Sequence, residues 1–184
     1  MVDMSRVVLR SLDLSDAPTL TAYRNHPEVA RYQSWTLPYS LKEAAALITD
    51  MQGRTPGQEG WTQLGLADAG TGELLGDLAV RGVGARQAEI GFTLAPQAQG
   101  RGLASEGLGL LLTHLFGTLA LHRVYASIDP RNGRAASLLC RAGFRHEGTT
   151  LESYLHRGEW TDDATYGLLA REWRARHAQE KPTL

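Results

Sequence analysis

Residues 91–104 read Gly91-Phe92-Thr93-Leu94-Ala95-Pro96-Gln97-Ala98-Gln99-Gly100-Arg101-Gly102-Leu103-Ala104. The first residues are typical of a strand, and the leucine-rich run that follows the stretch is typical of a helix. A Gly-x-Gly turn therefore opens a helix, where unpaired backbone N–H groups and the helix dipole favour an anion. Glycines at 100 and 102 let a ligand approach the backbone closely, and Arg101 adds a charge that can pair with phosphate. The turn is thus a candidate diphosphate site.

Two familiar nucleotide-binding motifs do not fit this turn. A dinucleotide fingerprint would need a third glycine at Ser105 and a ribose-binding acid about 20 residues further on. A Walker loop would need Gly-Lys-Ser/Thr after the glycines, and the sequence lacks it. A nicotinamide-binding domain is therefore the weaker alternative.

Outside the turn, hydrophobic periodicity and the positions of Gly and Pro predict a mixed succession of strands and helices. Strands are expected at residues 7–12, 61–67, 74–80, 87–94, 122–128, from 144 and at 165–169, and helices at 16–25, 28–32, 41–51, 103–119, 132–142 and 172–178. Ser15 or Asp16 is the expected cap of the first helix, and Ser40 with Glu43 forms a capping box for the third. Early hairpins and a later βαβ crossover predict a mixed sheet with helices on its faces.

Bulk properties bound the class of protein. We expect one domain over residues 1–184, with residues 175–184 as a flexible tail. A net charge of -1 provides no overall electrostatic attraction to nucleic acid or to an anionic membrane surface. The single cysteine, Cys140, and the lack of a signal-peptide-like or membrane-spanning apolar run favour a cytoplasmic protein. The six scattered histidines show no metal-ligand spacing, so we expect no metal.

Several motifs together resemble the GNAT superfamily of N-acetyltransferases. Gln97-x-x-Gly100-x-Gly102 is similar to its Gln/Arg-x-x-Gly-x-Gly/Ala motif, and Asn132 and Gly143-Phe144 follow at the family's separations. Other phrases resemble the ribosomal-protein N-terminal (Rim-type) branch. These are Leu9-Arg10, Pro27-Glu28-Val29-Ala30-Arg31-Tyr32, Asp162-x-x-x-Tyr166 and Glu172-Trp173. The resemblance covers nearly the whole chain, and it is the order and spacing of the motifs that make it specific.

The resemblance implies a GNAT-like central sheet, mixed and mostly antiparallel, with acetyl-CoA between splayed parallel strands at 89–94 and 122–128. It implies cofactor contacts by Phe92, Thr93, Leu94, Gln97, Gln99, Gly100, Arg101, Gly102, Leu103, Ala104 and Asn132. Asn132 is also expected to cap its helix. The expected reaction is direct attack of a neutral amine on the thioester in a ternary complex, in a monomer or homodimer. The branch favours a protein N-terminal α-amine as acceptor, and a small-molecule amine stays open.

The reaction needs a base, and Glu89 on the strand before the turn is the first choice. A carboxylate that only orients the amine is the alternative role. Tyr154 is a candidate for proton transfer, or for a packed aromatic in the acceptor pocket. Glu106, on the cofactor helix, is expected to be a solvated or capping residue.

The general acid departs from the family pattern. Ala135 and Leu139 occupy the positions where relatives have Ser and Tyr, and neither can donate a proton. Ser137 is the nearest hydroxyl, although at about 100° per residue it points roughly 200° away from Ala135. Cys140 is expected to be a small core residue. The missing acid motivates a second hypothesis, an acyl-CoA-binding sensor or scaffold with little transferase activity.

Overall fold

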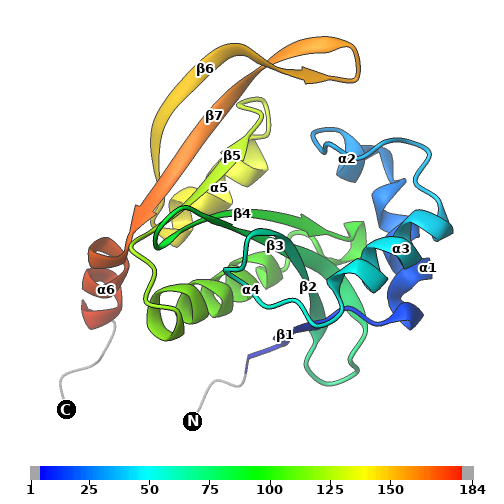
Figure 1. The fold of residues 1–184 in the computed structure, drawn as a ribbon, viewed down its shortest axis with the longest axis horizontal. Helices are drawn as coiled ribbons and strands as arrows, with labels where there is room; N and C mark the ends of the chain where they lie inside the picture. The colour runs from blue at the N-terminus through cyan, green and yellow to red at the C-terminus, as the bar shows by residue number, and fades with distance from the viewer. Residues whose placement is uncertain (1–4, 180–184) are drawn as a thin grey trace.

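The computed structural model describes residues 5–179 and contains a seven-stranded sheet flanked by helices (Figure 1). The strands are β1 (Val7–Ser11), β2 (Gly60–Asp68), β3 (Leu74–Val83), β4 (Gln87–Leu94), β5 (Arg123–Ile128), β6 (Arg145–His156) and β7 (Glu159–Leu169). The helices are α1 (Ala17–Arg24), α2 (Pro27–Ala30), α3 (Leu41–Met51), α4 (Leu103–Thr113), α5 (Gly133–Ala142) and α6 (Ala170–Gln179). The strand order is β1-β2-β3-β4-β5-β7-β6, and the β4–β5 pair is parallel while its neighbours pair antiparallel. The expected mixed, mostly antiparallel α/β fold is confirmed.

β4 and β5 separate soon after they begin. Three residue pairs join them, and Glu89↔Tyr125 is the last. β4 then continues to Leu94 and β5 to Ile128 with no further pairing between them in the described chain. The expected splay is therefore present, and it leaves backbone groups along one edge of β4 available to a ligand.

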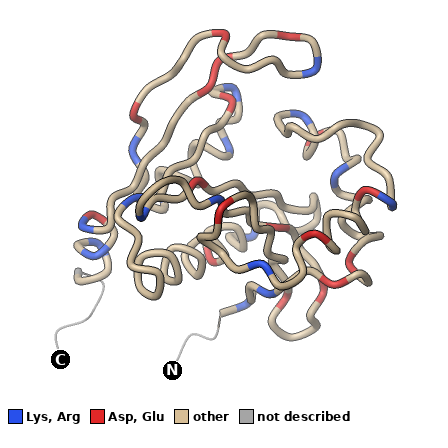
Figure 2. The backbone as a smooth tube through the Cα atoms, in the orientation of Figure 1, with Lys and Arg blue, Asp and Glu red and all other residues tan. Residues whose placement is uncertain are grey.

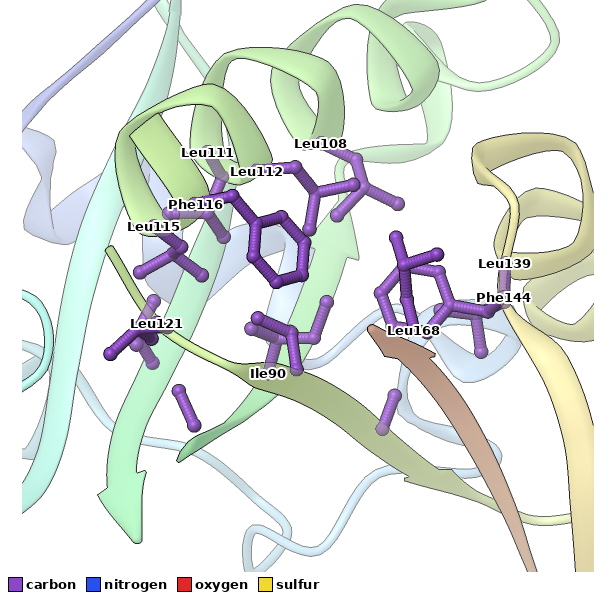
Figure 3. Packing of buried hydrophobic residues seen from close by; sticks show 14 of the residues in the cluster. Ile90, Leu108, Leu111, Leu112, Leu115, Phe116, Leu121, Leu139, Phe144 and Leu168 are labelled. Carbon is purple, nitrogen blue, oxygen red and sulfur yellow. The ribbon is translucent and has the colours of Figure 1, made fainter. Parts of the chain in front are cut away.

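One face of the sheet packs against α4 and α5 in an apolar core (Figure 3). Ile90 of β4 lies beneath Leu108 and Leu112 of α4, and Leu139 of α5 joins the same cluster. All of them are buried, and each such side chain stabilises the fold by roughly 1.5–3 kcal/mol on transfer from water. This core fixes where α4 begins relative to the end of β4.

The opposite face carries a buried polar network that attaches α1 to β3. Asp77 accepts hydrogen bonds from the Tyr23 hydroxyl, from Arg24 at 3.4 Å and from Gln63 at 2.7 Å. Burial, with the Asp77 carboxylate second, raises the pKa of Tyr23 well above its usual value. The Arg24 guanidinium also stacks 4.5 Å from the centre of the Trp35 ring. Breaking a buried ion pair by removing one partner is strongly destabilising, so the network holds α1 firmly against β3.

The helix caps match expectation in part. Ser40 and Glu43 form the expected capping box at α3. At the first helix, Asp16 holds the N-cap position of α1 as expected, but its side chain bonds to Asp13 in the capping box of a short 3-10 turn and not to α1, which begins at Ala17. The expected helix over 103–119 also divides, since α4 ends at Thr113 and a π-helical turn continues to Thr118. None of the described helices is long and apolar enough to cross a membrane.

The β6–β7 hairpin is longer than expected and extends away from the rest of the sheet (Figure 1). The prediction that the last strand begins at 165 is wrong, because β7 begins at Glu159. Eleven of the twelve residues of β6 are exposed, so this strand has no buried face whose alternation could be recognised. Residues 175–179 of the expected tail belong to α6, and residues 180–184 lie outside the described chain.

Candidate active site

A cleft of about 1210 Å³ lies at the end of β4, between the start of α4, the start of α5 and the segment around α2. Most of the expected cofactor residues line it, together with one catalytic candidate. They are Phe92, Thr93, Leu94, Gln99, Gly100, Gly102, Leu103, Ala104, Asn132 and Ser137. Gln97 and Arg101 are not among the lining residues, and neither are Glu89 and Tyr154. The fold thus brings together most of what the motif implied at one concave surface.

The turn before α4 presents free backbone amides. Gly100 and Gly102 adopt positive φ values of 72° and 79°, which favour glycine. Within residues 5–179, no hydrogen-bond acceptor partners the N–H groups of residues 100–104. The amide of Gln99, expected to join this set, donates instead to the Pro96 carbonyl at 3.2 Å. The remaining amides, at the positive end of the α4 dipole, fit the diphosphate of coenzyme A.

The turn is held from the side by the start of β1. Glu106 accepts hydrogen bonds from the Arg6 backbone at 3.1 Å and from its Nε at 2.7 Å, and the guanidinium also donates to the Arg101 carbonyl at 3.0 Å. The ion pair with Arg6 lowers the pKa of the Glu106 carboxyl. Glu106 therefore has a structural role, and the Arg6 guanidinium offsets its negative charge beside the turn at residues 100–104.

The start of α5 forms the opposite wall of the cleft. Asn132 caps the helix as expected, because its side-chain oxygen accepts from the Ala135 amide at 3.1 Å. Its side-chain NH2 stays available to a ligand. Leu139 is fully buried in the core, so the position of the family's tyrosine faces away from solvent. Cys140 is exposed, which corrects its expected place in the core.

Glu89 lies at the closed end of the splay, on the face toward α1. It forms an ion pair with Arg81 of β3 and accepts a hydrogen bond from the Tyr125 hydroxyl at 3.4 Å. Its side chain is 14% exposed, and the Arg81 guanidinium lies 5.1 Å from the centre of the Trp61 ring. The pairing with Glu89 raises the pKa of Arg81. The carboxylate is thus fixed in place and still reachable from this face.

The tip of the β6–β7 hairpin reaches the α2 segment. His156 lies 3.1 Å from the Arg31 carbonyl, and Arg157 donates to the Trp35 carbonyl at 3.5 Å. Tyr154 stacks on His156, is 45% exposed and is not among the residues that line the cleft. These contacts attach the hairpin tip to the segment that follows α2.

Sequence reasoning missed the basic character of the cleft. Its lining includes Arg31, Arg131, Arg134 and Arg141 against a single carboxylate, Glu28. Figure 2 shows basic residues on the segment after α2 and around the start of α5, and both segments contribute to the lining of the cleft. The spacing of Arg134 and Arg141, seven residues apart on a predicted helix, was the one available signal. Within residues 5–179, no group of three His, Cys, Asp or Glu side chains lies close enough to hold a metal ion.

Comparisons with known proteins show the family of this chain. The family described as "Acetyltransferase (GNAT) domain" matches residues 6–145. An uncharacterised N-acetyltransferase, p20, of Bacillus licheniformis is 29% identical over 174 residues, which cover 91% of this chain and 95% of that protein. The [ribosomal protein uS5]-alanine N-acetyltransferase of Escherichia coli is 32% identical over 84 residues, or 46% of this chain and 43% of that protein.

Solved structures share the fold. Spermidine N-acetyltransferase from Vibrio cholerae, in complex with CoA and spermine, superimposes with a TM-score of 0.79 at 24% identity, over 93% of this chain and 99% of that one. An acetyltransferase from Bacillus anthracis gives a TM-score of 0.80 at 23% identity, over 91% and 96%. The relatives act on different acceptors, which leaves the branch open. This chain belongs to the GNAT acetyltransferase family and is an acetyl-CoA-dependent N-acetyltransferase.

Proposed function

We propose that this enzyme acetylates the α-amine at the N-terminus of a protein or peptide. The observation that carries the proposal is the state of the carboxylates on the acceptor face of β3 and β4. Asp77 is buried and paired with Arg24, and Glu89 is paired with Arg81. A polyamine carries several positive charges and needs unpaired acids around it. This face offers arginines beside its carboxylates, which disfavours a polycation.

An α-amine also makes the smallest demand on a base. Its ordinary pKa of about 7.7–8.0 leaves roughly a third of it neutral at pH 7.5, against about 0.1% of a lysine amine with a pKa near 10.4. Glu89 then has to accept a proton from an amine that is already partly deprotonated. A carboxylate held by Arg81 and Tyr125 suits this role better than it suits a strongly basic amine.

In this proposal, three groups of the enzyme each take one step of the acyl transfer. Glu89 accepts the proton of the attacking amine, directly or through water. The Leu94 amide, at the end of β4, is the proposed donor to the oxyanion that develops on the thioester carbonyl. Ser137 lines the cleft and is the nearest hydroxyl on α5 to the leaving thiolate. A thiol with a pKa near 8.5 also leaves readily with a proton from water.

The hairpin supports a protein acceptor over a small one. Leu151, Leu155 and Trp160 are exposed by 74%, 53% and 59% at its outer end. Apolar groups gathered at an exposed tip are typical of surfaces that contact another protein.

The test is a comparison of acceptors at saturating acetyl-CoA, followed by release of free thiol. The panel contains a peptide with a free N-terminus and no lysine, the same peptide with an acetylated N-terminus, and spermidine. The proposal expects thiol release with the first peptide alone, and acetyl on its α-nitrogen by mass spectrometry. Faster turnover of spermidine, or turnover of the blocked peptide, would show that the acceptor is a different amine.

A further inference from the structure

Two arginines on one face of α5 line the cleft without a carboxylate partner. Arg134 and Arg141 are seven residues apart, close to two helical turns, so their side chains leave the helix on the same side, about 10 Å apart along its axis. Neither forms an ion pair with any carboxylate of residues 5–179. Arg131, by contrast, pairs with Asp129 at 2.7 Å. Two unneutralised charges therefore border this cavity from one helix.

The two arginines lie at different points along the cleft. Arg134 donates a hydrogen bond to the side chain of Gln99 at 3.1 Å, which puts it beside the turn with the free amides. Arg141 lies two turns further along α5, and both Arg141 and Ser105 of α4 line the same cleft. The β4 residues line its other end. The cleft therefore continues past the phosphate turn into a groove between α4 and α5.

We propose that Arg134 binds the diphosphate of coenzyme A and that Arg141 binds its ribose 3′-phosphate. The pantetheine arm is assigned to β4 and the diphosphate to the turn, so the groove between α4 and α5 is the place left for the nucleotide. A guanidinium pairs with a phosphate through two charged hydrogen bonds, and two long side chains on one helix face can reach neighbouring phosphates. The proposal depends on the use of acetyl-CoA and is independent of the acceptor.

Arg141 also has a plain structural role, because it lies in the last turn of α5, where a cation stabilises the helix dipole. Loss of that role would weaken the helix and affect every ligand equally. Selectivity between ligands that differ only in the 3′-phosphate separates the two roles. The test therefore compares coenzyme A with 3′-dephospho-coenzyme A, by calorimetric titration of the full chain without acetyl transfer.

The wild type should bind coenzyme A about tenfold more tightly than the dephospho form, a modest factor because the site is open to solvent. Arg141→Ala should reduce that ratio to near one, and Arg141→Lys should restore part of it. Arg134→Ala should weaken both ligands by a similar factor and keep the ratio. Arg174→Ala, on the exposed side of α6, is the matched control and should leave both affinities unchanged.

Two results would overturn the assignment while the enzyme remains an acetyltransferase. One is equal affinity of the wild type for the two ligands. The other is an Arg141→Ala variant that keeps the wild-type ratio. If coenzyme A itself did not bind, both this inference and the use of acetyl-CoA would be wrong.

Discussion

The hydroxyl of Tyr125 donates a hydrogen bond to Oε2 of Glu89, 3.4 Å away, across the last residue pair that β4 and β5 share. Arg81 holds the same oxygen from the neighbouring strand β3. Because the strands part immediately beyond this pair, the carboxylate is anchored at the point where β4 and β5 begin to separate. If Glu89 is the general base, as we propose, these two contacts keep its geometry fixed while the acceptor approaches.

Replacing Glu89 by glutamine keeps its shape and removes its ability to take a proton. We expect Glu89→Gln to lower kcat by about 100-fold or more, the usual contribution of a general base, and to leave the Kd for acetyl-CoA within about twofold. Thiol release and calorimetric titration measure the two quantities. Glu73→Gln, at an exposed position in the β2–β3 turn, should change neither. Unchanged turnover of Glu89→Gln across pH 6–9 would remove Glu89 from this role.

The contact between Arg6 and Glu106 predicts a pH-dependent stability difference. Pairing with Arg6 lowers the pKa of Glu106 in the folded chain, so the gain is present above the ordinary carboxyl pKa and is lost as the pH falls through the folded value. At pH 7, Arg6→Ala should reduce Tm by about 1–2 °C, as expected for an exposed pair worth about 0.5 kcal/mol. As the pH falls toward 3, the difference in Tm between the two proteins should shrink.

Thermal unfolding followed by circular dichroism between pH 3 and 7 measures this difference. Lys42→Ala, exposed on α3, serves as the control for loss of one positive charge. A Tm difference for Arg6→Ala that is as large at pH 3 as at pH 7 would contradict the ion-pair explanation.

Two glycines of α4 should respond in opposite directions to alanine. A Cβ at Gly107 would lie 2.6 Å from Cδ1 of Leu66, which is fully buried in the core. We expect Gly107→Ala to destabilise the fold by about 1–3 kcal/mol through overpacking. A Cβ at Gly109 meets no atom within 4 Å, so Gly109→Ala should stabilise the helix by about 0.5–1 kcal/mol. The denaturant midpoint of unfolding measures both effects. A shift of the same sign for the two variants would contradict the difference between the close contact at Gly107 and the open space at Gly109.

The parts of this enzyme that could be predicted from sequence are those with local causes. The strand, glycine turn and helix over residues 91–104 follow from periodicity and backbone freedom, and the Ser40–Glu43 capping box follows from hydrogen bonding three residues apart. The hairpin of β6 and β7 was predicted too short, and the exposed residues on both faces of β6 leave no alternation that would mark that strand.

Contacts between distant segments lay beyond sequence reasoning. Arg6 meets Glu106 across 100 residues, and the Arg134 side chain meets Gln99 across 35. Such pairs depend on how α4, α5 and β1 pack, and a single sequence carries no record of that packing. For the same reason Arg101, the arginine inside the motif, seemed the phosphate partner, whereas Arg134 lines the cleft.

The central claim is that a diphosphate binds the free amides at the start of α4, and amide chemical shifts of the isotope-labelled enzyme test it most directly. Coenzyme A and pantetheine are titrated separately, since pantetheine lacks the diphosphate. The account predicts large shifts at residues 100–104 with coenzyme A only, and shifts at Phe92–Leu94 with both ligands. If coenzyme A leaves residues 100–104 unshifted, or if pantetheine shifts them as strongly, the diphosphate does not bind at this turn.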